Sequence, residues 1–283
     1  MPSVVIPAHN EEVLIGSCLR SVVESHVPGL EVVVVPNACS DRTAEIARGV
    51  CDSVKVVETI IPGKTKAINL GECHVKSFPR LFLDGDIVLE PGTLSAIFST
   101  LGEKIKIASP RPIFETGHSD VFVRLFYRSL SANSYFAAGA PNGSGAFAVT
   151  ETGRSRWGEF PDVIADDGFV ERHFELGEAC TVEGPGAVVR APATVRALID
   201  IKTRARLGQM QLSQLFPDLA ERGRSSVGGT FRRLLAKPSL WASVPVYAGV
   251  RVAERLRAKR QARKSGFTGW LRDDSSRTPA EHV

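Results

Sequence analysis

The chain has 283 residues, 43% of them hydrophobic, and a formal net charge of +4 at neutral pH. This composition is that of an ordinary soluble globular protein, long enough to bury one large core or two merged subdomains. The five cysteines are scattered with no C-x-x-C pair, which disfavours a disulfide framework and a zinc site. The N-terminal stretch MPSVVIPAHNEE has no positively charged lead-in, so we expect no secretory signal and a cytoplasmic location.

Short apolar, β-branched runs alternate with amphipathic stretches over the first hundred residues. The expected strands are SVVIP, EVVVVP, SVKVVE and RLFLD, and the segments that follow them are typical of helices, opening near Glu11, Ser40, Gly63 and Pro91. This alternation predicts an α/β protein with a Rossmann-like, mostly parallel central sheet and helices on both faces. In such open sheets, ligands bind beyond the carboxyl ends of the strands.

Polar residues gather where these strands are expected to end. Asp84 and Asp86 directly follow the apolar run LFL, and carboxylates there are costly to bury unless a cation or a hydrogen-bond donor meets them. The chain contains neither a P-loop nor a Gly-rich dinucleotide fingerprint. A divalent cation on Asp86 would be another way to hold phosphates.

Five motifs occur in order between about residues 3 and 210. They are VVIPAHNEE, VPNACSDRTAEIA, GKTKAINLG, LFLDGDIVLEPGTL and IADDGFVERHFELG. This series resembles that of the inverting family 2 glycosyltransferases, which have the GT-A fold. The resemblance implies a catalytic domain over residues 1–220, with a nucleotide-sugar-binding half at 1–100 and an acceptor-binding half at 101–220.

The resemblance also implies a donor site. Asp84 would contact the ribose or the sugar of the donor, and Asp86 would bind Mg²⁺ or Mn²⁺ that bridges the diphosphate. Asn37 stands where the family often has an aspartate that reads the base. The other donor-binding residues implied by the motifs are Pro7, Ala8, Asn10, Glu12, Lys64, Asn69 and Gly85.

The catalytic candidate is Asp167, which lies beside Asp166 in the segment IADDG. An inverting transfer needs a carboxylate that takes the proton of the acceptor hydroxyl, and a neighbouring like charge raises the pKa of one of the two groups. The resemblance places further residues near the acceptor or the diphosphate. These are Gly143, Ser144 and Gly145 in a small-residue turn, and Arg204, Arg206 and Gln209 in a later basic segment.

The C-terminal segment 231–283 is predicted to be a basic amphipathic helical tail. Residues 231–264 contain ten Lys or Arg and one acid, Glu254, and they include an apolar run at 240–253 that is too short to span a bilayer. One interpretation is an anchor at an anionic membrane surface, with Leu240, Trp241, Val244, Val246 and Tyr247 in the lipid. The other is a helix packed in the core and followed by a solvated basic helix. No nucleic-acid recognition fold accompanies the cluster, so we expect no nucleic-acid partner.

These features predict an enzyme that transfers a sugar from a UDP- or GDP-sugar to a hydroxyl acceptor with inversion, at the inner face of the membrane. The acceptor would be a small molecule, a lipid-linked sugar or a cell-envelope glycan. Two alternatives remain open. The segment LFLDGDIVL also fits haloacid-dehalogenase-like phosphatases, with Asp84 as the nucleophile, and a sugar-nucleotide-binding protein without catalysis would show the same motifs. Trp157 could line an acceptor cleft or simply pack.

Overall fold

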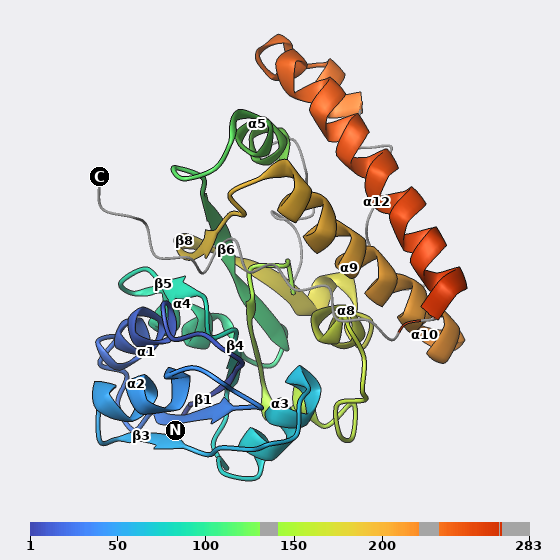
Figure 1. The fold of residues 1–283 in the computed structure, drawn as a ribbon. Helices are drawn as coiled ribbons and strands as arrows, with labels where there is room; N and C mark the ends of the chain where they lie inside the picture. The colour runs from blue at the N-terminus through green and yellow to red at the C-terminus, as the bar shows by residue number, and fades with distance from the viewer. Residues whose placement is uncertain (131–140, 221–231, 266, 268–283) are drawn as a thin grey trace.

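The computed structural model describes residues 1–130, 141–220, 232–265 and 267. Its centre is a mixed eight-stranded sheet in the order β3-β2-β1-β4-β7-β6-β8-β5, with helices on both faces (Figure 1). The strands are β1 Ser3–Ala8, β2 Glu31–Pro36, β3 Val54–Val56, β4 Arg80–Leu83, β5 Val88–Leu89, β6 Ile107–Glu115, β7 Ala146–Val149 and β8 Ala179–Arg190.

The four strands predicted in the first hundred residues are present and run parallel. β1 lies between β2 and β4, and β3 continues the sheet beyond β2. The helices between them are α1 Ile15–Val23, α2 Thr43–Val50, α3 Lys64–Glu72 and α4 Thr93–Thr100. α1 begins at Ile15, later than the expected opening near Glu11, because Glu11 is held in the loop: its backbone N–H donates to Thr43 Oγ1 at 2.7 Å.

The second half of the sheet is mixed, which the alternation in the sequence did not indicate. β7 is antiparallel to both of its neighbours, β4 and β6, whereas β6 and β8 pair in parallel. Because β7 adds to the open edge of β4, residues 146–149 bring the chain back beside the strand that ends at Asp84. Shorter helices complete this half: α7 Glu151–Arg154, α8 Asp166–Glu171, η2 Leu176–Glu178 and α10 Pro217–Ala220.

Alternation along the buried strands divides the interior into two layers. Val4 and Ile6 of β1 face a cluster built with α1, α2 and α4, and Val5 faces the other cluster, built with α3, α8 and several aromatic rings. Both faces of β1 and β2 are therefore covered, which explains why these strands read as continuous apolar runs. Helices on both faces leave the strand ends as the place where polar groups can meet a ligand.

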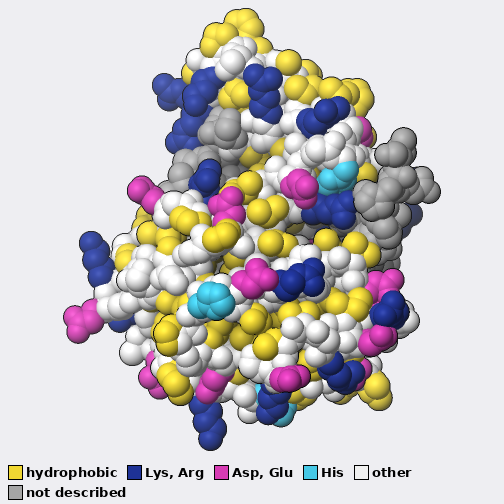
Figure 2. Space-filling model, turned by 90° about the vertical axis from the view of Figure 1, so that its left-hand side faces the viewer, with side chains coloured by type: hydrophobic (Ala, Val, Ile, Leu, Met, Phe, Trp, Pro, Cys, Tyr) yellow, Lys and Arg dark blue, Asp and Glu magenta, His cyan; other side chains and the backbone are white. Residues whose placement is uncertain are grey.

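A third cluster joins the C-terminal helices to the body. It contains side chains of α5 Val121–Ser129, α9 Val195–Leu215, η3 Pro238–Ser243 and α12 Val244–Ser265. Figure 1 shows α12 lying along α9 at one side of the molecule. In the face drawn in Figure 2, Lys and Arg side chains gather at the upper end beside exposed hydrophobic side chains, and most acidic side chains lie lower.

This packing corrects the predicted membrane anchor. Leu240 and Tyr247 are buried, and Val244 and Val246 pack against the same cluster. Trp241 is the one proposed anchor residue that is well exposed, at 59%. The alternative of a core-packed helix is therefore correct for Leu240, Val244, Val246 and Tyr247, but not for Trp241. Within the described part of the chain, no helix has the length and apolar character needed to cross a bilayer.

Candidate functional site

Two adjoining cavities lie at the carboxyl ends of β1, β2 and β4, and Pro7, Lys64 and Asp84 line both. The first, of about 110 Å³, extends toward β7 and α8. The second, of about 130 Å³, extends toward the loops after β1 and β2. Most of the predicted site residues meet here: Pro7, Ala8, Asn37, Lys64, Asp84, Gly85, Asp86, Gly143, Ser144, Gly145, Asp166, Asp167 and Arg204.

The turn after β4 positions Asp84. The backbone N–H of Asp84 donates to the carbonyl oxygen of Gly145 at 2.8 Å, and the N–H of Ile87 donates to the carbonyl oxygen of Asp84 at 3.1 Å. Gly145 has a φ of +69°, and a Cβ there would lie 2.7 Å from the Ile87 side chain and 3.2 Å from Asp84 Oδ2. The small-residue turn before β7 therefore has a physical cause: only glycine combines this conformation with this close approach.

Lys64 connects the two halves of the site. Its Nζ lies 2.6 Å from Asp84 Oδ1 and 3.0 Å from Asp166 Oδ2. Burial of the ammonium opposes its ionisation, but the charges of Asp166 and Asp84 outweigh that effect, and the pKa of Lys64 is raised. Burial raises the pKa of Asp84 to about 6, although Lys64 acts in the opposite direction. The donor-side and acceptor-side carboxylates thus share one partly buried cation.

Asp166 and Asp167 form the first turn of α8. Asp166 is buried against Lys64, whereas Asp167 is half-buried at the first cavity and accepts from the backbone N–H of Gly168 at 2.7 Å. Burial and then the charge of Asp166 raise the pKa of Asp167. α9 supports this turn closely, since a Cβ at Gly208 would lie 2.7 Å from the Cβ of Ala165.

Two arginines in the basic segment of α9 lie on different sides of that helix. Arg204 lines the second cavity, whereas Arg206 is directed to the other side, where its charge acts on Glu254 of α12. Residues two apart on a helix point in nearly opposite directions. Gln209 accepts from Arg172 Nη2 at 3.0 Å and lines neither cavity. The predicted role of Arg206 and Gln209 at the diphosphate is therefore not supported by their positions.

The loops after β1 and β2 hold each other. Asn37 is buried, donates from Nδ2 to the Ala8 carbonyl oxygen at 2.8 Å and accepts from the Gly63 N–H at 3.2 Å. Asn10 accepts from the backbone N–H of Ser40 at 2.8 Å, and Glu12 Oε2 accepts from that of Arg42 at 3.1 Å. Asn10 and Glu12 therefore hold the two loops together and do not line the second cavity.

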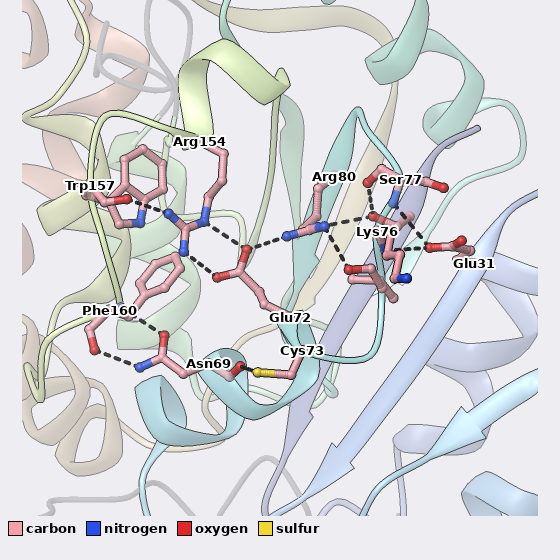
Figure 3. A network of polar contacts seen from close by, with 12 residues as sticks. Glu31, Asn69, Glu72, Cys73, Lys76, Ser77, Arg80, Arg154, Trp157 and Phe160 are labelled. Atoms are coloured by element: carbon pink, nitrogen blue, oxygen red, sulfur yellow. Dashed lines mark hydrogen bonds and ion pairs between the residues drawn. The ribbon is translucent and has the colours of Figure 1, made fainter.

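Asn69 lies outside both cavities, in the network of Figure 3. Its amide donates to the Phe160 carbonyl oxygen at 2.9 Å and accepts from the Phe160 N–H at 2.8 Å. One turn further along α3, Glu72 pairs with Arg80 and Arg154, both at 2.6 Å. Trp157 is buried in the adjoining aromatic cluster, which favours the packing interpretation of this residue. The first residue of α3, Lys64, thus lies in the site, and the later residues Asn69 and Glu72 contact the acceptor-side half.

Two residues that the motif reading did not assign to the site also line the second cavity: His9 and Glu11. Glu11 is 6% exposed. Its position just after the first expected strand is the signal that could have identified it, because a carboxylate is costly to bury there without a partner. His9 Nδ1 lies 2.6 Å from the carbonyl oxygen of Asn37. The apolar floor of the first cavity, from Ile68, Phe82 and Phe147, could be seen only once α3, β4 and β7 were brought together.

The residues of this site could hold a divalent ion only together with a bound diphosphate. Asp84 and Asp86 line the second cavity, and Mg²⁺ takes one or two carboxylates and completes its shell with water and phosphate oxygens. Among the described residues, no group of three or more His, Cys, Asp or Glu could hold a metal by itself. The residues therefore fit an ion that also contacts a diphosphate.

The fold and the site together define an α/β protein that places carboxylates, a lysine and an arginine at the strand ends, where a phosphate-bearing ligand binds in such sheets. Residues 3–146 match the family model described as Glycosyl transferase family 2. The chain therefore belongs to glycosyl transferase family 2. This membership confirms the resemblance seen in the motifs and excludes the phosphatase alternative.

Several relatives are similar to this chain. A 4,4'-diaponeurosporenoate glycosyltransferase of Staphylococcus aureus is 29% identical over 169 residues, which are 57% of this chain and 42% of that protein. The crystal structure of S. aureus TarS 1–349 in complex with UDP-GlcNAc has a TM-score of 0.54 at 14% identity and covers 93% of this chain and 91% of its own. Glucosyl-3-phosphoglycerate synthase from Mycobacterium tuberculosis, in complex with Mn²⁺, UDP-glucose and phosphoglyceric acid, has a TM-score of 0.51 at 19% identity and covers 76% and 79%.

The two solved structures confirm the predicted fold class, a GT-A-like α/β domain followed by C-terminal helices. The chain spans less than half the length of the curated relatives it matches.

Proposed function

We propose that this chain transfers a sugar from a nucleotide-diphosphate sugar to an acceptor hydroxyl, with inversion at the anomeric carbon. The observation that carries the proposal is the convergence of Asp84, Asp86, Asp166 and Asp167 with Lys64 on two adjoining cavities at the strand ends. The complexes of similar proteins with UDP-GlcNAc and with UDP-glucose support a UDP-sugar as the donor. A GDP-sugar is the other candidate, because Asn37 stands where the family often has an aspartate.

In this proposal the second cavity takes the nucleotide diphosphate and the first takes the sugar and the acceptor. Asp86 would hold Mg²⁺ or Mn²⁺, which supplies positive charge to the departing diphosphate when it is bound. Arg204 also lines the second cavity and adds a positive charge there. The Mg²⁺ and Mn²⁺ complexes of glucosyl-3-phosphoglycerate synthase support this assignment.

Asp167 is the proposed general base. It lines the first cavity, and its raised pKa improves its capacity to accept the proton of the attacking hydroxyl at neutral pH. Asp166 is instead paired with Lys64 at 3.0 Å, so we assign it to positioning Lys64 and to raising the pKa of Asp167. The proton passes from the acceptor oxygen to the Asp167 carboxylate as that oxygen bonds to the anomeric carbon and the diphosphate leaves.

Residues 1–220 form the proposed catalytic unit, with a donor half at 1–100 and an acceptor half at 101–220. We propose a cytoplasmic enzyme whose acceptor is lipid-linked or close to the membrane. The basic C-terminal helices support the membrane location.

The experiment that tests donor use is a thermal-shift panel of UDP-, GDP-, dTDP- and CDP-sugars, with Mn²⁺ and with a chelator. A donor at 100 times its Kd stabilises the folded state by about 2.7 kcal/mol, so one base should raise Tm clearly, and only with the metal. The Asp86→Ala variant should lose this metal-dependent shift and keep the Tm of the free protein. An equal shift in chelator, or no shift with any donor, would contradict the proposal, and binding without sugar transfer would favour a non-catalytic binding protein.

A further inference from the structure

α12 leaves one side exposed, and that side is apolar in its first half. Trp241 in η3, Val252 and Leu256 are 59%, 55% and 51% exposed, and Pro245 is exposed as well. At 3.6 residues per turn, positions 245, 252 and 256 lie on the same side of the helix. Leu235, whose carbonyl oxygen accepts from Trp241 Nε1 at 3.0 Å, is 50% exposed next to Trp241.

The same side becomes basic in the second half of α12. Lys259 follows Val252 by seven residues and Arg263 follows Leu256 by seven, so both continue the exposed side, and Arg255 and Arg260 flank it. All four are exposed. We call the combined surface the outer face: its apolar part is Leu235, Trp241, Pro245, Val252 and Leu256, and its basic part is Arg255, Lys259, Arg260 and Arg263.

Packing against the body determines which side of α12 is turned outward. Tyr247, Val250 and Ala258 are buried on the inner side. Glu254, 1% exposed, lies there too and pairs with Arg251 at 2.9 Å, while Arg257 pairs with Asp200 of α9 at 2.5 Å. Rotating α12 would expose the buried apolar side chains and separate the ion pairs, so the outer face is a rigid feature of the fold.

We infer that the outer face docks on an anionic lipid surface. Exposed apolar side chains that lie singly are common, but a continuous exposed stripe marks an interaction site. A tryptophan and aliphatic side chains next to a cluster of Arg and Lys are typical of helices that lie in the interface of an anionic membrane. The one acid between residues 232 and 264, Glu254, is on the inner side, so the outer face of α12 carries no charge that would repel such a surface.

This inference deepens the proposed lipid-linked acceptor and rests on it for its biological meaning. α9 lies between α12 and the site, and its Arg204 lines the second cavity. Packed helices lie 8–10 Å apart, so the docked surface would be about 20 Å from the diphosphate region.

The test is flotation of the full chain with vesicles of phosphatidylcholine alone or mixed with phosphatidylglycerol, without nucleotide, at low and high salt. We expect binding to the anionic vesicles only, weakened by salt because exposed charges are screened. The triple variant Lys259→Gln, Arg260→Gln, Arg263→Gln should lower the partition coefficient on the order of 100-fold. Val252→Ser with Leu256→Ser should lower it about tenfold or more.

Matched controls change equally exposed residues elsewhere. Lys55→Gln, Lys76→Gln and Lys104→Gln remove three exposed charges, and Leu176→Ser with Leu215→Ser remove two exposed leucines; neither set should change binding. Absence of vesicle binding by the full chain, or equal losses in variants and controls, would overturn the inference. The inference would also be overturned if the full chain self-associated in sedimentation velocity without binding vesicles, and if Val252→Ser with Leu256→Ser abolished that self-association. Because no nucleotide is present, failure here is distinguishable from failure of donor binding in the thermal-shift panel.

Discussion

At the scale of single residues, the site depends on two adjacent carboxylates that the fold treats differently. Asp166 is 4% exposed and has Lys64 as its counter-ion. Asp167 is half-buried, accepts from the N–H of Gly168 and faces the first cavity. Asp167 lines the first cavity, whereas Asp166 is held in an ion pair with Lys64, so the two carboxylates should contribute differently to catalysis.

Asp167→Asn should therefore keep donor affinity and lower kcat by about 10²-fold or more, the usual size of a general-base contribution. Donor affinity is measured by calorimetry and transfer by single-turnover kinetics. Asp166→Asn is the matched variant, and we expect it to retain more activity than Asp167→Asn. The reverse order would show that Asp166 is the base.

The pH dependence of kcat/KM provides a second residue-scale prediction. Burial and the charge of Asp166 raise the pKa of Asp167, and only the ionised carboxylate can take a proton. The rate should fall as the pH drops through that raised pKa, above the value near 4 of an ordinary aspartate. Asp166→Asn removes the like charge and should move the acidic limb of the profile to lower pH. If the limb does not move, the charge of Asp166 does not raise the pKa of the base.

At the scale of elements, the donor and acceptor halves are joined by α3. Glu72 accepts from Arg80 of β4 and from Arg154 of α7, with its own side chain 9% exposed (Figure 3). Arg154 also donates to the carbonyl oxygen of Trp157 at 2.7 Å. This network links β4, which carries Asp84 at its end, to the aromatic cluster under α8.

Glu72→Gln should lower the free energy of unfolding by about 3 kcal/mol, because it leaves Arg80 and Arg154 buried without a counter-charge. Urea unfolding followed by circular dichroism measures the difference. Glu45→Gln is the control: Glu45 pairs with Arg42 at 2.9 Å, but both side chains are more than 60% exposed, so its loss should leave the free energy of unfolding almost unchanged. Equal costs would mean that the Glu72 network does not stabilise the fold.

At the scale of the whole molecule, the C-terminal helices complete the core of the body. Val123, Phe126 and Leu198 are at most 1% exposed, and the cluster they form also contains Leu240 and Tyr247. The ring of Tyr247 stacks on Phe126 with centroids 5.9 Å apart. The tail therefore cannot be removed as an independent anchor.

Deletion of residues 231–283 should expose this cluster and lower the soluble yield and Tm of the remaining chain, since each large apolar side chain that is uncovered costs about 1.5–3 kcal/mol. The membrane-anchor interpretation of the sequence predicts the opposite result, a catalytic body that stays intact and soluble after the deletion. Differential scanning fluorimetry of the two chains, with and without donor, decides between them. An unchanged Tm would show that residues 231–283 are a separable segment that does not stabilise the body.

The residue order by itself determined the four parallel strands, the helices between them and the chemical character of the strand ends. These are local properties. An apolar run followed by Asp84 and Asp86 is visible in a dozen residues, and parallel strands that are buried on both faces are recognised as continuous apolar runs. The motif series also indicated the family, which the match over residues 3–146 then established.

Only the tertiary structure decided which polar residues meet. It directed Arg204 into the second cavity and Arg206 away from it, gave Asn69 to the Phe160 backbone, and made Lys64 the shared partner of Asp84 and Asp166. It also turned Tyr247 inward and Trp241 outward. Such choices depend on contacts between segments tens of residues apart and on the rotation of each helix against its neighbours, and a local pattern of residue types leaves both open.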